Sequence, residues 1–295
     1  MLPIVNSSRL YTESGSISDC NFEMKDFYSL DEISKQLEAL NPPEGKIVLM
    51  HSSLRSVGSV EGGAEGLLDV LVRHFTKNGG LFCVPTHTWH NLEKDITLDL
   101  KSFDHCLGAM SKIAICDGRG VRSLNPTHSM VVFGDRARAL EFIKDDLNIE
   151  TPTDPKSCYG KIIDSGGQIL LVGVNHQKNT VLHTVDEMLS VPNRMEDTFT
   201  SVSVLDDSGV RYDRKIRLFY TDYTDDISYR FFKYETAFRY HHCIVDGFVG
   251  NAPTQLCDAL RMKRVVELIY QNSGNLDPLF GEDAIPQKMY CSSLK

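Results

Sequence analysis

Short runs of apolar residues, each bounded by glycine, proline or polar residues, recur along the first two thirds of the chain. Four of these runs are four to six residues long, which is the length of a buried β-strand rather than of a helix. They lie at residues 47–50, 81–84, 130–133 and 169–174. We therefore predict four strands that belong to one central sheet.

Apolar residues spaced three and four apart indicate helices between and after these runs. Residues 64–76 place Leu67, Leu71 and Phe75 on one face, and they lie between the first two predicted strands. A strand, a helix and a second strand in direct succession are typical of a βαβ unit. Further helices are predicted at residues 137–147, 180–189, 229–240 and 254–270.

Two local signals refine this outline. Ser29 and Glu32 have the spacing of a capping box, which predicts that a helix begins there and runs until two consecutive prolines stop it. Later in the chain, residues 202–205 and 216–220 flank the turn sequence Asp-Asp-Ser-Gly. This arrangement predicts an antiparallel hairpin.

The composition is that of an ordinary globular protein. Of the 295 residues, 41% are apolar and 24% are charged. Residues 1–25 are polar and show no periodic pattern, so we expect a flexible N-terminal arm followed by one domain over residues 26–295. The predicted fold class is α/β, with a central mixed sheet flanked by helices and an antiparallel hairpin in the C-terminal half.

Charge and cysteine content narrow the classes of function. The net charge of −9 argues against nucleic acid as a partner, because neutralising phosphates requires clustered lysine and arginine. No apolar run approaches the ~18 residues of a membrane span, and the N-terminus lacks the pattern of a secretory signal. The eight cysteines include no CxxC pair, which favours reduced thiols in a cytoplasmic protein. The oligomeric state stays open, and a homo-oligomer is compatible with the sequence.

Polar residues gather where the predicted strands end, which is where α/β sheets usually bind ligands. His51, Ser52 and Ser53 follow the first strand, and hydroxyls and backbone amides there can hold an anion or a carbonyl. Residues 85–90 and 122–129 lie beside the second and third strands and contribute three further histidines and the only tryptophan. Each stretch is also explained, without any ligand, as a polar turn with a helix cap.

Several familiar catalytic motifs are missing from the sequence. Neither the glycine patterns of nucleotide-binding loops nor the Gly-x-Ser-x-Gly elbow of α/β-hydrolases occurs. No HExxH spacing supports a zinc site built from His51, His87 and His90, so we expect no metal. Cys83 and Cys257 lie in apolar runs, where a buried thiol is inert, so a cysteine nucleophile is not favoured.

The most informative cluster surrounds His183. This histidine falls in the first turn of a predicted helix, with Asp186 at i+3 and Glu187 at i+4. A carboxylate beside an imidazole fixes its tautomer and raises its basicity, which suits a general base. The alternative is an ordinary charged pair at a helix start, and the spacing alone favours neither interpretation.

These clusters, taken in order, resemble the aminoglycoside 3-N-acetyltransferase family. The resemblance extends over about residues 45–272, and it includes the stretches MHSSLRSVG, RSLNPTHS and NTVLHTVDE. It implies direct transfer of acetyl from the cosubstrate acetyl-CoA to an amino group of an aminoglycoside-like amino sugar. No covalent enzyme intermediate is expected, and the partners are these two small molecules.

The resemblance also implies roles for individual residues. The catalytic histidine of the family falls on His183, and its carboxylate falls on Asp186, where the family usually has glutamate, so Glu187 is an alternative. The motif around Thr127 and His128 is expected to line the thioester and acceptor region, with Asn125 in place of the usual histidine. The residues expected to bind acetyl-CoA are Ser52, Ser53, Leu54, Val57, Ser123 and Thr127.

The resemblance also gives one further departure from the family pattern, a candidate acid and a set of candidate hydrogen-bond donors. Cys158 stands where the family usually has a proline, which leaves the cosubstrate channel open to a local difference. Asp222, after the predicted hairpin, is a candidate for a further acid. Hydroxyls of Thr127 or Ser123, or strand-end amides near Ser53, are candidate donors to the thioester oxyanion.

Three other functions fit the sequence. One is an acyltransferase of the same fold that acts on a non-antibiotic amine in glycan or secondary metabolism. Another is a non-catalytic protein that sequesters CoA or an amine, and the third is a metal-dependent hydrolase that uses His51, His87, His90 and His128. The salt dependence of the reaction separates the first alternative, the same-fold acyltransferase, from an aminoglycoside enzyme. Recognition of a polycation by acids such as Asp95, Asp99 and Asp104 would weaken as the ionic strength rises.

Overall fold

The predicted strands form the middle of a large mixed sheet in the computed structural model, which describes residues 24–92, 97–103, 105–223, 225–281 and 283–294. Each of the four apolar runs corresponds to one strand, so these four predictions are confirmed. The strands are β2 (Ile47–Ser52), β4 (Leu81–Pro85), β7 (Met130–Phe133) and β8 (Gln168–Val172).

Parallel pairing in the centre of this sheet brings the chemistry-bearing loops together. β2 pairs in parallel with both β4 and β8, so the carboxyl ends of three neighbouring strands meet at one edge. Antiparallel strands complete the sheet on both sides, and they are β6 (Val121–Arg122), β11 (Ile244–Val249) and β12 (Ala252–Asp258). Within the described residues the order is β11-β12-β8-β2-β4-β7-β6.

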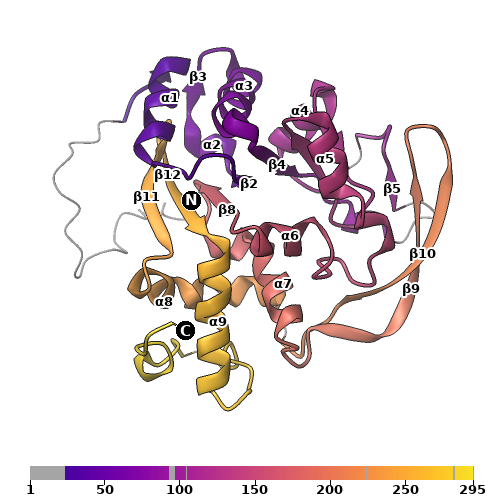
Figure 1. Cartoon of the computed structure of the whole chain (residues 1–295), viewed down its shortest axis with the longest axis vertical. Coiled ribbons are helices and arrows are strands. Elements are labelled where there is room, and N and C mark those ends of the chain that lie inside the picture. Colours follow the sequence, from indigo (N-terminus) through magenta and orange to yellow (C-terminus); the bar gives the residue numbers. More distant parts are fainter. Residues whose placement is uncertain (1–23, 93–96, 104, 224, 282, 295) are drawn as a thin grey trace, which may run out of the picture.

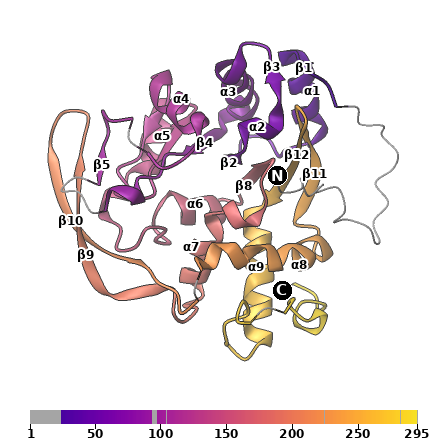
Figure 2. The ribbon, with the colours of Figure 1, turned by 180° about the vertical axis from the view of Figure 1, so that it is seen from behind.

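Helices cover both faces of the central sheet (Figures 1 and 2). Because side chains alternate along a strand, Leu49 packs into the core on one face and Met50 into the core on the other. Burial on both faces explains why these strands appear as continuous apolar runs. One face is covered by α1 (Leu30–Ala39), α3 (Gly63–Phe75) and α4 (Ala109–Asp117). The other is covered by α5 (Arg136–Ile143), α6 (Cys158–Asp164), α7 (Val181–Met188), α8 (Glu235–Tyr240) and α9 (Ala259–Asn272).

The predicted capping box near the N-terminus and the predicted βαβ unit are both confirmed. Ser29 caps α1, and its backbone N–H donates to the Glu32 carboxylate at 2.9 Å, which completes the capping box. The β2–α3–β4 segment forms the predicted βαβ unit, with parallel strands.

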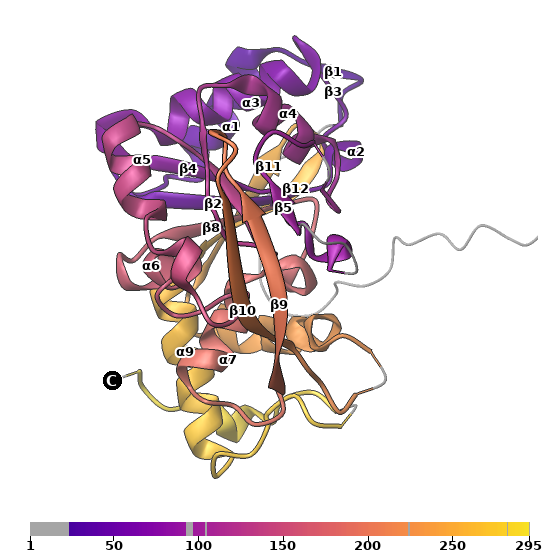
Figure 3. The ribbon, with the colours of Figure 1, turned by 90° about the vertical axis from the view of Figure 1, so that its right-hand side faces the viewer.

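The predicted hairpin is present and is longer than expected. Strand β9 (Met195–Leu205) pairs with β10 (Arg211–Phe219) on one side and with the short β5 (Leu98–Asp99) on the other, in a separate three-stranded sheet. Figure 1 shows this ribbon at the opposite side of the molecule from β11 and β12, and Figure 3 shows it from the side, with the hairpin in front. Only the region around Val204 and Ile216 is fully buried, so the apolar pattern marked the inner part of each strand and missed the exposed ends.

Three helix boundaries need correction. The segment predicted as a helix at 254–270 begins with strand β12, and its helix starts at Ala259 after the cap Asp258. Residues 229–240 divide into a 3₁₀ helix (Ile227–Tyr234) and the short α8. The predicted helix at 137–147 ends early, and a separate 3₁₀ turn follows.

Some expectations fall on residues that the structure does not describe. Residues 1–23 of the expected arm, together with Asp95 and Asp104, lie outside the described residues. Asp99 lies on β5, beside the hairpin. Within the described part of the chain, no helix has both the length and the apolar character needed to cross a membrane.

Candidate active site

A cavity of about 450 Å³ lies at the carboxyl edge of the central strands, which is the size typical of small-molecule sites. Its floor is formed by residues at or just beyond the ends of β2 and β4. The first turn of α7 and the inner side of the β9–β10 hairpin form further walls. Side chains named by the sequence analysis that line it are His51, His87, Thr127, His128 and His183.

Four histidines meet in this cavity in their neutral form. Each is less than a tenth exposed, and the rings of His87 and His128 lie 4.4 Å apart between centroids. Burial lowers the pKa of both His51 and His128 to about 3, and it lowers the pKa of His87 well below the ordinary value. Neutral imidazoles accept protons, and they do not repel a cationic ligand.

His183 lies between two aromatic rings. Its imidazole stacks on Phe219 of β10 with centroids 4.3 Å apart, and it meets Phe231 edge-on at 4.9 Å. Burial lowers the pKa of His183 to about 4, while the charge of Asp226 raises it and that of Arg194 lowers it. Asp226 lines the same cavity and caps the 3₁₀ helix that follows the hairpin. It is therefore the acid that acts on this imidazole from the cavity.

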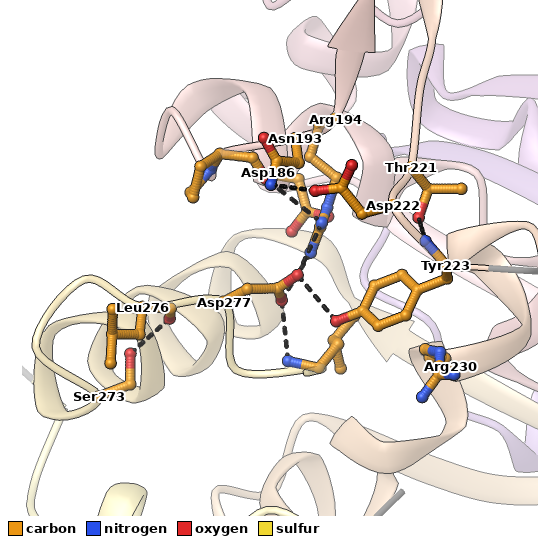
Figure 4. Close-up of polar contacts among 12 residues, drawn as sticks. Asp186, Asn193, Arg194, Thr221, Asp222, Tyr223, Arg230, Ser273, Leu276 and Asp277 are labelled. Atoms are coloured by element: carbon orange, nitrogen blue, oxygen red, sulfur yellow. Dashed lines mark hydrogen bonds and ion pairs between the residues drawn. The ribbon is translucent and has the colours of Figure 1, made fainter. Parts of the chain in front are cut away.

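The two acids predicted to pair with His183 have other partners. Asp186 is buried and accepts a hydrogen bond from Arg194 Nε at 2.6 Å (Figure 4). Glu187 accepts hydrogen bonds from the hydroxyls of Thr151 and Thr153. Among the described residues neither carboxylate is hydrogen-bonded to His183, and neither lines the cavity. The expected hydrogen bond between His183 and Asp186 or Glu187 is therefore absent from the structure, because each acid binds side chains of a neighbouring segment instead.

Asn125 explains how the chain holds Thr127 and His128 in the wall. Its side-chain oxygen accepts hydrogen bonds from the backbone N–H groups of Thr127 and His128, at 3.1 and 2.8 Å. Its amide nitrogen donates to the carbonyl of Pro152 at 2.8 Å, and Pro152 also lines the cavity. The Thr127 hydroxyl lies 3.0 Å from Nδ1 of His128, although Thr127 itself is fully buried.

Of the six residues expected to bind acetyl-CoA, Thr127 lines the cavity, and the other five divide into two groups. Ser52, Ser53 and Leu54 are half-buried at the end of β2, next to His51 but outside the cavity wall. The side chains of Val57 and Ser123 are buried, and the Ser123 hydroxyl accepts a hydrogen bond from the Met130 N–H. Neither the Val57 nor the Ser123 side chain lines the cavity.

Cys158, which replaces the family's usual proline, begins α6 and is fully buried. Its backbone N–H donates to the carboxylate of Asp146 at 2.8 Å. A proline has no N–H and could not make this bond. The substitution is thus explained by a buried structural contact, away from the cavity.

Sequence reasoning missed several residues of the wall. Asp222 accepts a hydrogen bond from the Tyr220 hydroxyl at 2.6 Å and does not line the cavity, whereas Asp226, which is exposed like Asp222, does line it. The Asp-x-Ser sequence at the start of a helical segment is a capping signal that marks Asp226. Trp89, the only tryptophan noted in the sequence, also lines the cavity, and lining residues that the sequence analysis did not single out are Lys178, Glu196, Phe219 and Tyr229.

The metal-dependent alternative lacks a set of ligands in the part of the chain that is described. No group of three or more histidine, cysteine, aspartate or glutamate side chains is placed there to hold a metal ion. His87 instead pairs with the Tyr159 hydroxyl at 2.8 Å.

Known proteins similar to this chain are acetyltransferases. The chain is 30% identical over 169 residues to aminoglycoside N(3)-acetyltransferase IV from Salmonella sp, a match covering 55% of this chain and 59% of that protein. It is 23% identical over 257 residues to aminoglycoside N(3)-acetyltransferase III from Serratia marcescens, covering 78% and 93%. The chain therefore spans less than two thirds of the first relative and most of the second.

Solved structures agree. A histidine-to-alanine mutant of aminoglycoside acetyltransferase AAC(3)-IVa, in complex with gentamicin, superposes with a TM-score of 0.68 at 25% identity, over 81% of this chain and 87% of that one. AAC-IIIb in a binary complex with CoASH superposes with a TM-score of 0.67 at 20% identity, over 80% and 94%, and confirms the fold.

The family model described as aminoglycoside 3-N-acetyltransferase matches residues 49–270, which is most of the chain. The predicted α/β fold class is confirmed, as is the prediction of an enzyme at the level of the family, whose cosubstrate is acetyl-CoA. The chain belongs to the aminoglycoside 3-N-acetyltransferase family.

Proposed function

We propose that this protein transfers the acetyl group of acetyl-CoA to an amino group of an aminoglycoside-like amino sugar, with His183 as the general base. The observation that carries the proposal is the position of His183, a neutral buried imidazole in the wall of a cavity that also contains Asp226. The family assignment supports the acetyl donor.

The chemistry requires a base at this position. An ammonium group has no lone pair, so the acceptor first gives up one proton to solvent and attacks as a neutral amine, and its nitrogen must lose a second proton once it has bonded to carbon. The amine nitrogen bonds to the thioester carbonyl carbon, and the imidazole of His183 takes the proton that the nitrogen loses. When the carbon–sulfur bond then breaks, the CoA thiolate leaves and takes up that proton. The charge of Asp226 favours the imidazolium that exists between these steps.

His128 and Thr127 fit a role beside the reacting carbonyl. When the Thr127 hydroxyl donates to Nδ1 of His128, the ring carries its proton on Nε2. His128 can then donate a hydrogen bond to the developing oxyanion, and Thr127 acts by fixing that tautomer. This assignment replaces Ser123, whose hydroxyl is hydrogen-bonded to the Asp146 carboxyl and lies outside the cavity, and Ser53, whose N–H donates to the Val172 carbonyl. Removal of one oxyanion donor typically costs roughly 10²–10³ in rate.

The walls of the cavity suit a cationic sugar. Glu196 and Asp226 both line it, and carboxylates attract the ammonium groups of an amino sugar. Trp89 and Tyr229 are about half exposed in the same wall, and they offer apolar faces to a ring. The 25% identical acetyltransferase solved with gentamicin supports an aminoglycoside as acceptor.

The pantetheine arm of acetyl-CoA is assigned to the end of β2. Ser52, Ser53 and Leu54 lie beside His51 and are only half-buried, so a ligand that enters the cavity along this strand end can contact them. We keep these three residues as the cosubstrate contacts of the proposal.

A thiol-release assay tests the proposed reaction. Purified protein is mixed with acetyl-CoA and each member of a panel of aminoglycosides and simple amino sugars, at low and high salt. Release with a polycationic aminoglycoside, with an acceptor KM that rises with salt, supports the proposal. Release with simple amino sugars alone favours the alternative of a non-antibiotic amine. CoA binding without release in any mixture favours sequestration and contradicts the proposal.

A further inference from the structure

A buried ion network centres on Arg194 (Figure 4). One of its members, Asp186, lies about one helical turn after His183 on α7. The guanidinium of Arg194 donates through Nε to Asp186 at 2.6 Å, and through Nη1 and Nη2 to the two oxygens of Asp277 at 2.9 and 2.8 Å. The Tyr223 hydroxyl donates to the same carboxylate of Asp277 at 3.0 Å. Arg194 thus joins two acids that are far apart in the sequence.

The three charged residues come from three separate parts of the fold. Asp186 lies on α7, three residues after His183, and Arg194 immediately precedes β9. Asp277 lies in the segment after α9, beyond residue 270, where the match to the family model ends. This C-terminal segment is docked firmly, since Leu279 is fully buried in the core.

Arg194 also fixes the base of the hairpin. Its carbonyl accepts a hydrogen bond from the backbone N–H of Tyr220 at 2.9 Å, so it ties the start of β9 to the end of β10. The residue before Tyr220 is Phe219, whose ring stacks on His183. The same arginine is therefore connected both to the helix that carries the imidazole and to the ring that covers it.

The chemistry of this network is suited to holding a position. The Arg194 side chain is 4% exposed and that of Asp186 is 1% exposed, so neither charge is screened by water. Arginine is planar and can bind one carboxylate with two parallel hydrogen bonds while a third reaches another acid. A lysine could offer the charge but not this geometry.

We infer that Arg194, held by Asp277 of the C-terminal segment, is a positioning residue that sets the place of α7 and of Phe219 around the His183 imidazole. This inference rests on the proposed role of His183 as the base. Arg194 does not line the cavity, so it acts through its neighbours and touches no substrate.

The pKa of His183 reports on the charge of Arg194, and a role in packing alone would not change that pKa. This charge lowers the pKa of His183, after the larger effect of burial. The other charged or titratable groups near the imidazole come from every surrounding wall, and they are His51, His87, His128, Lys178, Asp186, Glu196 and Asp226. None of these changes in the variants below.

The experiment compares Arg194→Met, Arg194→Lys, Asp277→Asn and Tyr223→Phe with the wild type in the full chain. The control Arg239→Lys alters an exposed arginine that bonds Glu235 and Asp246 on the surface. For each folded variant, kcat and the KM for acetyl-CoA are measured by thiol release, and the pKa of His183 is followed by NMR of labelled histidine.

We expect kcat to fall at least about tenfold in Arg194→Met, with the KM for acetyl-CoA within about twofold of the wild type. The pKa of His183 rises when the positive charge of Arg194 is removed. In Asp277→Asn the lost negative charge has the opposite sign, so that pKa falls while kcat drops by a smaller factor. Arg194→Lys retains the charge and restores the pKa, but not the full kcat.

Wild-type kcat in both Arg194→Met and Asp277→Asn overturns the inference. A loss of kcat/KM that comes entirely from a higher KM for acetyl-CoA also overturns it. If Arg194→Met does not fold, Asp277→Asn and Tyr223→Phe decide, and wild-type kcat in both overturns it. A His183→Ala variant separates the two proposals. Retained activity there contradicts the base assignment itself, whereas lost activity there with unaffected Arg194 variants contradicts only the positioning role.

Discussion

The imidazole of His183 and the ring of Phe219 lie face to face, with centroids 4.3 Å apart and planes inclined by 19°. His183 comes from the first turn of α7, and Phe219 is the last residue of β10. The hairpin, which belongs to a sheet of its own, thus supplies part of the surroundings of the proposed base. We therefore expect the proposed reaction to depend on the position of the hairpin.

Replacing Phe219 with alanine is expected to lower kcat about tenfold, because the imidazole loses the surface that fixes its plane. Stability should fall by roughly 1–2 kcal/mol, since the ring is only half-buried. Thiol release and urea unfolding measure the two effects. Phe199→Ala, on the exposed side of the same hairpin, is the control and should change neither by much. Equal kcat in both variants would contradict the contact's importance.

Asp226 is expected to matter for the basicity of His183, whereas Asp222 is not. Asp226→Asn keeps the cap of the 3₁₀ helix but removes the charge that raises the pKa of His183, so kcat/KM should fall roughly tenfold or more. Asp222→Asn alters an acid four residues earlier that does not line the cavity, and it should stay within about twofold of the wild type. Steady-state kinetics on both variants makes the comparison. The assignment of the cavity acid is wrong if the two losses are alike or reversed.

Asn125 should be required for stability as well as for the wall of the site. Asn125→Ala leaves two buried N–H groups and the Pro152 carbonyl without partners, and we expect a loss of about 2–4 kcal/mol in the free energy of unfolding. Chemical denaturation measures it. Asn272→Ala, which removes one exposed hydrogen bond at the end of α9, serves as control and should cost under about 0.5 kcal/mol. A similar, small cost for both would show that the Asn125 contacts are unimportant.

Glu187 is expected to make stability depend on pH. Burial raises its pKa to about 7 despite hydrogen bonds from Thr151 and Thr153, so the folded protein retains a proton that the unfolded chain loses near pH 4.5. The associated stability is present below about pH 4.5 and is lost as pH rises towards 7. Between about pH 5 and pH 8, this group should lower the free energy of unfolding by at most about 3 kcal/mol.

Urea unfolding of Glu187→Gln at both pH values tests this. Its free energy of unfolding should change less with pH than that of the wild type, by the amount just given. Glu141→Gln, which alters an acid with a 70% exposed side chain, should leave the wild-type dependence intact. An unaltered pH dependence in Glu187→Gln is the result that counts against the argument.

The sequence predicted those elements whose environment is simple. The central strands are buried on both faces, so their apolar runs are unbroken, and the cap formed by Ser29 and Glu32 is a purely local structure. The β12 strand was taken for the start of a helix because its buried Ala252, Thr254 and Leu256 run directly into the apolar face of α9. In that sequence the two periods overlap and hide the boundary.

The sequence indicates only those cavity residues that lie in local motifs. His183, Thr127 and His128 follow from motifs that are continuous in sequence. The partner of Asp186 does not, because Arg194 and Asp277 reach it only through folding, and a spacing of three residues on a helix does not say which way a carboxylate turns. The sequence does not indicate Asp226, because it lies 43 positions further along the chain than His183 and the two line one cavity only after folding.

The central claim is that His183 removes the proton from the acceptor amine. The most direct measurement is thiol release by His183→Ala with an aminoglycoside that the wild type accepts, together with calorimetric titration of CoA into both proteins. We predict a loss of at least about 10²-fold in kcat/KM, with a CoA Kd within about twofold of the wild type. Wild-type turnover by His183→Ala would contradict the account.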